Sequence, residues 1–219
     1  MTIDDLIDSF PTTPFIFAGS GLTRRYYNLP NWAGLLEIFA KRVSNDELSF
    51  AQYMGKANKD LPRVASLISR DFDEKWYADK HMRTISNEVM EQVADSIVSP
   101  FKAEIAAELK RHTDVIPEYK DEVALLKEIS SDHVTGFITT NYDCFQEALT
   151  GYRSYVGQDE LIFSSIQGVG EIYKIHGSID RPSSIVIDEQ DYADFNQKCA
   201  YLAAKLMTIF MEYPIIFIG

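Results

Sequence analysis

The chain has 219 residues, of which 46% are hydrophobic, so it is long enough to bury a core and form an α/β domain. Its formal net charge is −12, from 33 acidic and 21 basic residues, and no run of Lys or Arg is long enough to follow a phosphate backbone. This composition excludes a disordered chain and argues against nucleic acid as a direct partner. An anionic ligand must be held locally, by backbone N–H groups and a few placed cations.

The cysteines and the N-terminus indicate where the protein works. Cys144 and Cys199 are too few and too far apart for a disulfide framework or a cysteine zinc site, so we expect no metal and a reducing compartment. The N-terminal residues are acidic where a signal peptide would be basic, and no apolar run approaches the ~18 residues of a membrane span. The sequence therefore predicts a cytoplasmic protein that does not enter the membrane.

In chain order, the first expected element is a buried strand at residues 14–18. A glycine turn follows at once, and then a helix whose start Asn31 is placed to cap. From about 46 to 130, apolar positions recur at three- and four-residue intervals, and strand-like runs are absent. This stretch is too long for a simple crossover, so it predicts a helical module inserted into an α/β domain.

Strand patterns return in the last third of the chain, and helical patterns lie between them. A short helix is expected at 143–150, and residues 188–213 have the polar start and the apolar stripe of a helix. A buried strand is expected at 134–140, and further strands are expected at 171–175, 184–187 and 214–219. Because a strand such as the last one leads into a loop at a ligand crevice, we expect the sequence to be a truncated piece of a larger protein.

These elements predict an α/β fold with a Rossmann-like, doubly wound and mainly parallel sheet. Residues 1–45 and 131–219 would form this domain. Residues 46–130 would form the inserted helical module.

A glycine motif follows the first strand. Gly19, Ser20 and Gly21 lie where backbone N–H groups can approach a phosphate, and Thr23 with Arg24 and Arg25 would add hydroxyl and cationic contacts. The full GxGxxG spacing fails because Arg24 occupies the third glycine position, so the ordinary dehydrogenase fingerprint does not apply. A plain strand-to-helix turn is the alternative.

A second motif, Thr139-Thr140-Asn141-Tyr142-Asp143, lies at the carboxyl end of the strand at 134–140, where open parallel sheets bind ligands. An asparagine at this point can donate to and accept from ribose hydroxyls or a water molecule. Asp143 and Gln146 have the spacing of an acidic capping box, so Asp143 either contacts a ligand or caps the next helix.

The third motif is His176-Gly177, again at the end of an apolar strand. A histidine with a pKa near ~6.5 can accept a proton from a sugar hydroxyl at neutral pH, and the glycine would leave room for a ligand. A single histidine is more often structural. The other three, His81, His112 and His133, lie in polar helical surroundings, and we expect them at the solvated surface.

Taken in order, these motifs resemble the sirtuin-like family, especially its prokaryotic members that hydrolyse NAD in antiviral defence. The resemblance rests on residues 19–23, on Pro30-Asn31-Trp32 through Leu36, on residues 139–143 and on His176-Gly177. It does not cover the helical middle. The deacylases of this family have a zinc ribbon with four cysteines, whereas this chain has two cysteines, which favours water over an acylated lysine as the acceptor.

The resemblance implies that NAD is the substrate and that the bond between nicotinamide and ribose breaks. Asn141 would position the attacking water and a ribose hydroxyl, and His176 would accept a proton. The other implied contacts with NAD are Gly19, Ser20, Gly21, Thr23, Arg24, Thr140, Asp143 and Gly177.

Other functions and partners stay open at this point. A module that binds a nucleotide without catalysis is the main alternative, and a protein deacylase is the third. The defence resemblance also implies self-association and a trigger-sensing region or partner protein outside the 219 residues.

Overall fold

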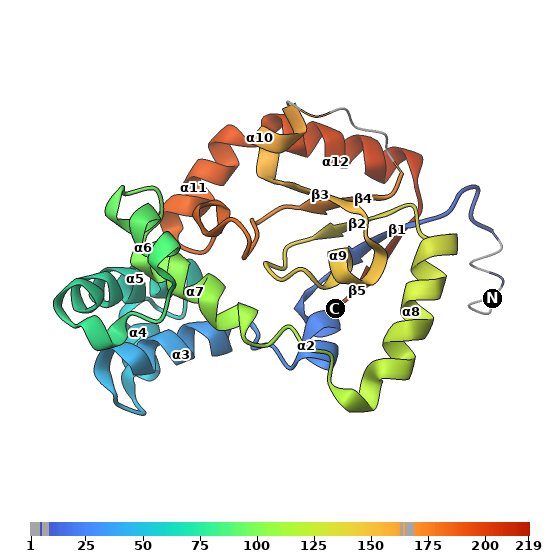
Figure 1. Ribbon diagram of the computed structural model, residues 1–219. Helices are drawn as coiled ribbons and strands as arrows, with labels where there is room; N and C mark the ends of the chain where they lie inside the picture. Colours follow the sequence, from blue (N-terminus) through green and yellow to red (C-terminus); the bar gives the residue numbers. More distant parts are fainter. Residues whose placement is uncertain (1–4, 6–8, 163, 165–168) are drawn as a thin grey trace. The chain divides into compact units, whose positions relative to one another are not determined.

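The computed structural model describes residues 5, 9–162, 164 and 169–219 (Figure 1). The chain divides into two compact units. The sheet unit comprises Met1–Asn28, Asp114–His176 and Cys199–Gly219, and the helical unit comprises Leu29–Thr113 and Gly177–Lys198. Among the described residues, none of the helices combines the length and the apolar character needed to cross a membrane.

A five-stranded, entirely parallel sheet with strand order β3-β4-β2-β1-β5 forms the centre of the sheet unit. The strands are β1 (Phe15–Ala18), β2 (Gly136–Thr139), β3 (Arg153–Val156), β4 (Glu171–Lys174) and β5 (Ile215–Ile218). In the inner strands β2 and β4 every residue is buried. Burial of every residue in these strands is typical of a parallel sheet covered on both faces and confirms the α/β class that the sequence predicts.

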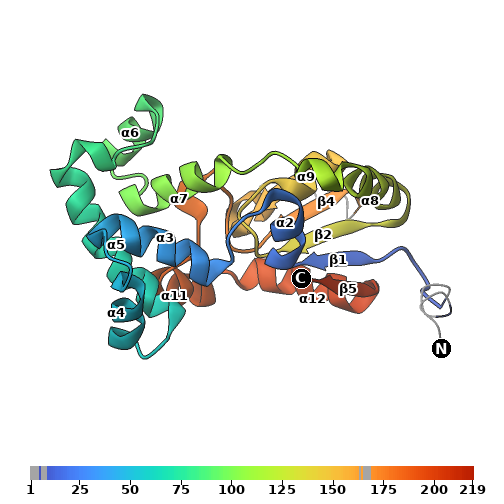
Figure 2. The same cartoon turned by 90° about the horizontal axis from the view of Figure 1, so that it is seen from below.

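Helices cover both faces of this sheet. The sheet unit contains α2 (Ser20–Tyr27), η2 (Pro117–Tyr119), α8 (Lys120–His133), α9 (Phe145–Thr150), α10 (Gly157–Ile162) and α12 (Ala200–Glu212). The chain steps in one direction from β1 to β2 and β3, and in the other direction to β4 and β5. Right-handed crossovers therefore place α8 and α9 on one face and α10 and α12 on the other, as Figures 1 and 2 show.

This strand order singles out the carboxyl ends of the adjacent strands β2 and β4. The connection after β2 leads to α9 on one face, while the connection after its neighbour β4 returns as α12 on the other. Connections that diverge from adjacent strands leave a crevice outside the carboxyl ends of those strands. The crevice expected from the topology therefore lies beyond Thr139 and Lys174, the last residues of β2 and β4.

The helical unit has a core of its own. Its helices are α3 (Trp32–Ser44), α4 (Ser49–Lys56), α5 (Leu61–Ala78), η1 (Lys80–Met82), α6 (Asn87–Ala94), α7 (Pro100–Lys110), η3 (Pro182–Ser184) and α11 (Glu189–Lys198). Asn31 caps α3 as predicted, since its Oδ1 accepts a hydrogen bond from Gly34 N at 2.8 Å. The rings of Phe39, Phe72 and Phe101 are fully buried and lie 5.2 to 5.9 Å apart.

The structure corrects two sequence-based expectations. Residues 184–187 do not form a strand: Ile187 is buried, but its N–H donates to Asp191 Oδ2 at 3.0 Å and not to a neighbouring strand. The helical stretch at 188–213 is divided into α11 and α12 at Cys199. In addition, the glycine turn after β1 is itself the start of α2, and β3 is a strand that the pattern did not predict.

Candidate active site

Asn141 and His176 follow adjacent strands at the carboxyl edge of the sheet. Each lies two residues beyond the last registered pair, Thr139 and Lys174, and the ladder continues with Ile175 N donating to Thr139 O at 2.8 Å. Both residues therefore lie where the strand topology predicts a crevice, after the strands whose connections diverge. The side chain of Asn141 is buried and that of His176 is half-buried.

Asn141 is anchored to the segment that follows β1. Its Nδ2 donates to Gly19 O at 2.9 Å and to Thr23 Oγ1 at 3.4 Å. Its backbone N–H donates to Thr139 Oγ1 at 3.0 Å, and that hydroxyl donates to Ala18 O at 2.8 Å. These bonds tie the end of β2 to the end of β1, so the orientation of the Asn141 amide is fixed by the fold.

The start of α2 is suited to an anion. Gly19 is its N-cap residue and has no side chain that could accept from the first N–H groups of the helix, and the first turn contains no acidic residue. The N-terminal N–H groups and the helix dipole favour negative charge at such an end. A Cβ on Gly21 would lie 2.6 Å from the carbonyl carbon of Gly219, so only glycine allows α2 to begin this close to the end of β5.

The two polar residues that follow in α2 point in different directions. Thr23 is 2% exposed and faces inward, where it accepts from Asn141 and forms a hydrogen bond with Asp143 that partly opposes the rise of that carboxyl's pKa caused by burial. Arg24 is exposed to solvent, and so is Ser20 in the first turn. Thr23 therefore serves the buried network, whereas Ser20 and Arg24 are accessible from outside.

Asp143 is buried beside Asn141. Its Oδ1 accepts from Phe145 N, the first residue of α9, at 3.0 Å. Burial raises the pKa of this carboxyl, while the bond from Phe145 and the positive charge of Lys174 oppose that rise. Both side-chain polar atoms of Gln146 are buried without a partner among the described residues, so Asp143 binds the helix start but the reciprocal capping box does not form.

His176 has the properties of a base. Burial lowers its pKa, so the imidazole is neutral at neutral pH and able to accept a proton. Gly177 differs from expectation in its surroundings: its φ is +98°, and a Cβ there would lie 2.2 Å from Ser184 O. The space beside this glycine is therefore filled by the backbone of Ser184 and is not left open for a ligand.

A known family model matches the part of the chain that contains the site residues after β2 and β4. Residues 135–219 match the model of the SIR2-like domain. This match supports the sirtuin-like family. The matched SIR2-like segment includes Asn141, Asp143 and His176, whereas Gly19 to Arg24 and the helical unit's first part lie before it. No curated protein matches the chain closely enough to add a named relative. The match connects the chain with an NAD-related function.

Lys174 is a residue of the SIR2-like segment to which sequence reasoning gave no role. It is fully buried, and its Nζ donates to the carbonyl oxygen of Asp143 and lies 3.1 Å from Glu147 Oε1. It thus fixes the loop after β2 to the strand that carries His176. The available signal was a lysine inside a strand buried on both faces, which requires a carboxylate or carbonyl partner nearby.

The other three histidines do not belong to the group of residues around Asn141 and His176. His81, His112 and His133 are exposed, as expected. Within the part of the chain that the structure describes, no group of three or more His, Cys, Asp and Glu side chains is arranged to hold a metal ion.

Proposed function

We propose that the protein hydrolyses NAD to nicotinamide and ADP-ribose. The observation that carries this proposal is the placement of Asn141 and His176 on adjacent strand ends, with the Asn141 amide bonded to Gly19 at the start of α2. An amide, a neutral imidazole and a helix start that favours anions are the groups that a ribose and a diphosphate require. The SIR2-like match supports the same substrate.

In the proposed reaction the bond between C1′ of the ribose and the nicotinamide nitrogen breaks. Nicotinamide leaves as a neutral molecule with the bonding electron pair, through a transition state with oxocarbenium character. Water attacks C1′, and its proton passes to His176 and then to solvent. Because the Nδ2 of Asn141 is held by Gly19, its Oδ1 is the atom that orients the water and a ribose hydroxyl.

The diphosphate would lie at the start of α2. The N–H groups of Ser20 and Gly21 would bind it, because that of Gly19 already donates to Ile218 O at 2.7 Å, and the exposed side chains of Ser20 and Arg24 would add polar contacts. Thr23 would act indirectly, because its hydroxyl holds Asn141 and Asp143 in place. Thr140 and Asp143 remain proposed contacts on the ribose side, whereas Gly177 is not proposed as one, because the backbone of Ser184 fills the space beside it.

The test measures nicotinamide and ADP-ribose by liquid chromatography after incubation with NAD. We expect equal amounts of both products from the unaltered protein and a loss of at least ~100-fold in Asn141→Ala and His176→Ala. His133→Ala, the same substitution at an exposed histidine of α8, should match the unaltered protein. Turnover that survives in both site variants would refute the assignment.

Two other outcomes would replace the proposal. NAD or ADP-ribose binding without nicotinamide release would make the protein a nucleotide-binding module. Release of acetyl-ADP-ribose in the presence of an acetylated peptide would make it a deacylase.

The sirtuin-like resemblance also leads us to propose a biological role for the NAD hydrolysis. In it, NAD loss inside the cytoplasm would defend the host against phage, and self-association and a trigger outside these residues would control the activity. Measuring cellular NAD during phage infection, with Asn141→Ala as the inactive control, tests this role. NAD levels that fall equally with the variant would contradict it.

A further inference from the structure

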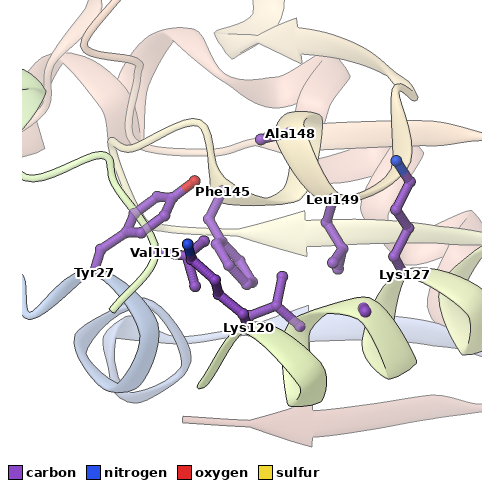
Figure 3. A pocket seen from close by; sticks show the side chains of 9 residues that line it. Tyr27, Val115, Lys120, Lys127, Phe145, Ala148 and Leu149 are labelled. Atoms are coloured by element: carbon purple, nitrogen blue, oxygen red, sulfur yellow. The ribbon is translucent and has the colours of Figure 1, made fainter. Parts of the chain in front are cut away.

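A pocket of about 240 Å³ lies within the sheet unit, between α8 and α9 and beside the last residue of α2 (Figure 3). The side chains around it are mostly apolar. They are Tyr27, Val115, Lys120, Val123, Ala124, Lys127, Phe145, Ala148 and Leu149. None of them is among the residues that we assign to NAD.

The pocket arises from two facing helical stripes. Positions 120, 123, 124 and 127 share one face of α8, and positions 145, 148 and 149 share one face of α9. Tyr27, Phe145 and Leu149 are buried and form the floor, whereas Ala124 and Ala148 are exposed. Because Ala124 and Ala148 are small, they leave the pocket between α8 and α9 open, whereas larger side chains at these positions would fill it.

The charge at the rim is positive in a protein that is acidic overall. Lys120 and Lys127 lie seven residues apart on α8, and Figure 3 shows them at opposite ends of the pocket with Phe145 and Leu149 between them. Both are exposed, and neither forms an ion pair with another described residue. The net charge of the whole chain is −12, so two unpaired cations beside an apolar floor are a local exception.

Several acidic groups lie near Tyr27 but outside the lining of the pocket. Burial and the neighbouring Asp143, Cys144, Glu147 and Asp114 raise the pKa of Tyr27 to about 12, which keeps its hydroxyl protonated at neutral pH. Glu147 is paired with Lys174. Among the described residues that line the pocket, the charged side chains are those of Lys120 and Lys127.

We propose that this pocket binds a small amphiphilic anion, a molecule with an apolar body and a single carboxylate. The body would lie against Phe145 and Leu149, and the carboxylate would reach the ammonium group of Lys120 or Lys127. The volume suits a chain of about eight carbon atoms, near the lower end of small-molecule sites. The site is separate from the NAD contacts, and the proposal does not depend on NAD hydrolysis.

Octanoate is the probe, and octylammonium and octanol are its cationic and neutral counterparts with the same chain. Binding is followed by the methyl NMR signals of Ala124, Ala148 and Leu149. We expect saturable shifts with octanoate at a dissociation constant at least ~5-fold below that of either counterpart. Equal or weaker binding of octanoate would overturn the proposal.

Variants then test the location. Ala148→Trp should fill the pocket and remove the binding, and Ala124→Trp fills it from the opposite helix if the first variant does not fold. Lys120→Gln or Lys127→Gln should weaken octanoate binding by about threefold, the range of an exposed ion pair. Lys56→Gln, at an exposed lysine of α4, should leave it unchanged. Octanoate binding that persists in both tryptophan variants would place the ligand elsewhere.

Discussion

Lys174 Nζ lies 3.1 Å from Glu147 Oε1, and this ion pair joins strand β4 to helix α9. The side chain of Lys174 is fully buried, whereas that of Glu147 is 21% exposed. The same ammonium group donates to the carbonyl oxygen of Asp143, two residues after Asn141. One buried cation thus connects the strand that leads to His176 with the loop that carries Asn141.

The first prediction concerns this pair. Lys174→Met leaves Glu147 and the Asp143 carbonyl without their cation, so we expect a loss of about 3–5 kcal/mol in the free energy of unfolding. Glu147→Gln should cost less, because Lys174 keeps its bond to the carbonyl of Asp143. Urea unfolding followed by circular dichroism measures both. The double variant should be less destabilised than the sum of the single variants, and strict additivity would show that the two side chains do not interact.

The second prediction concerns Gly177. A Cβ at this position would lie 2.2 Å from Ser184 O, and the φ of +98° is one that other residues rarely adopt. We expect Gly177→Ala to destabilise the helical unit by about 3 kcal/mol or more, from strain and from the displaced backbone. Both tryptophans, Trp32 and Trp76, belong to this unit, so their fluorescence reports its unfolding.

Gly55→Ala is the matched control for Gly177. Gly55 is inside α4, and nothing lies within 4 Å of the position of its Cβ. The same substitution there should stabilise the protein by about 0.5–1 kcal/mol, because alanine favours the helix. A similar loss of stability in both variants would contradict the steric explanation.

The predicted strands show where sequence patterns succeed. Residues 14–18, 134–140, 171–175 and 214–219 each contain a strand of the sheet, as their short and mostly apolar sequences predict. β3, with the sequence RSYV, was missed. It is an edge strand whose first residue, Arg153, is exposed, so its hydrophobic signal is weak.

The candidate site shows what the sequence patterns could not predict. The motifs placed Asn141 and His176 at strand ends, and the register supplied what the sequence could not, namely that these strands are neighbours. The role of Lys174 depends on a contact with Glu147, which precedes it by many residues, and no local pattern encodes that distance. The domain division at 46–130 stays a prediction, although α3 clusters in the structure with the helices that follow it.

The third prediction concerns Glu104 of α7, which is fully buried in the helical unit. It accepts from Trp76 Nε1 at 2.9 Å, Arg42 Nη2 at 3.0 Å and Thr84 N at 2.7 Å. Burial alone would raise the pKa of this carboxyl, but these donors, with the Thr84 hydroxyl, lower it below 4.5. Glu104→Gln replaces one acceptor oxygen by an NH₂ group, so we expect a loss of about 3–5 kcal/mol at neutral pH.

The same network predicts a pH dependence. Because the folded-state pKa of Glu104 is lowered, its stabilisation is present above the unfolded pKa and is lost as the pH falls through the folded pKa. The difference between the unaltered protein and Glu104→Gln should therefore shrink below pH 4.5. Glu74→Gln, at an exposed residue of α5, is the control. A difference that does not change with pH would show that Glu104 is not ionised in the folded protein.

The last prediction concerns the proton acceptor of the proposed hydrolysis. His176 accepts a proton only as neutral imidazole, and burial lowers its pKa below 6.5. NAD turnover should therefore persist below pH 6.5 and be lost only as the pH falls through the lowered pKa. The folded state binds this proton less readily than the unfolded chain, so the stability contributed by His176 also falls in acid.

Asp143, whose pKa burial raises, is the other group whose protonation could cause the loss of turnover on the acidic side of the pH profile. Asp143→Asn keeps the acceptor for Phe145 N and removes that titration, so the limb of kcat/KM should stay in place in this variant. A limb that disappears with Asp143→Asn would assign the titration to the carboxyl and not to the imidazole.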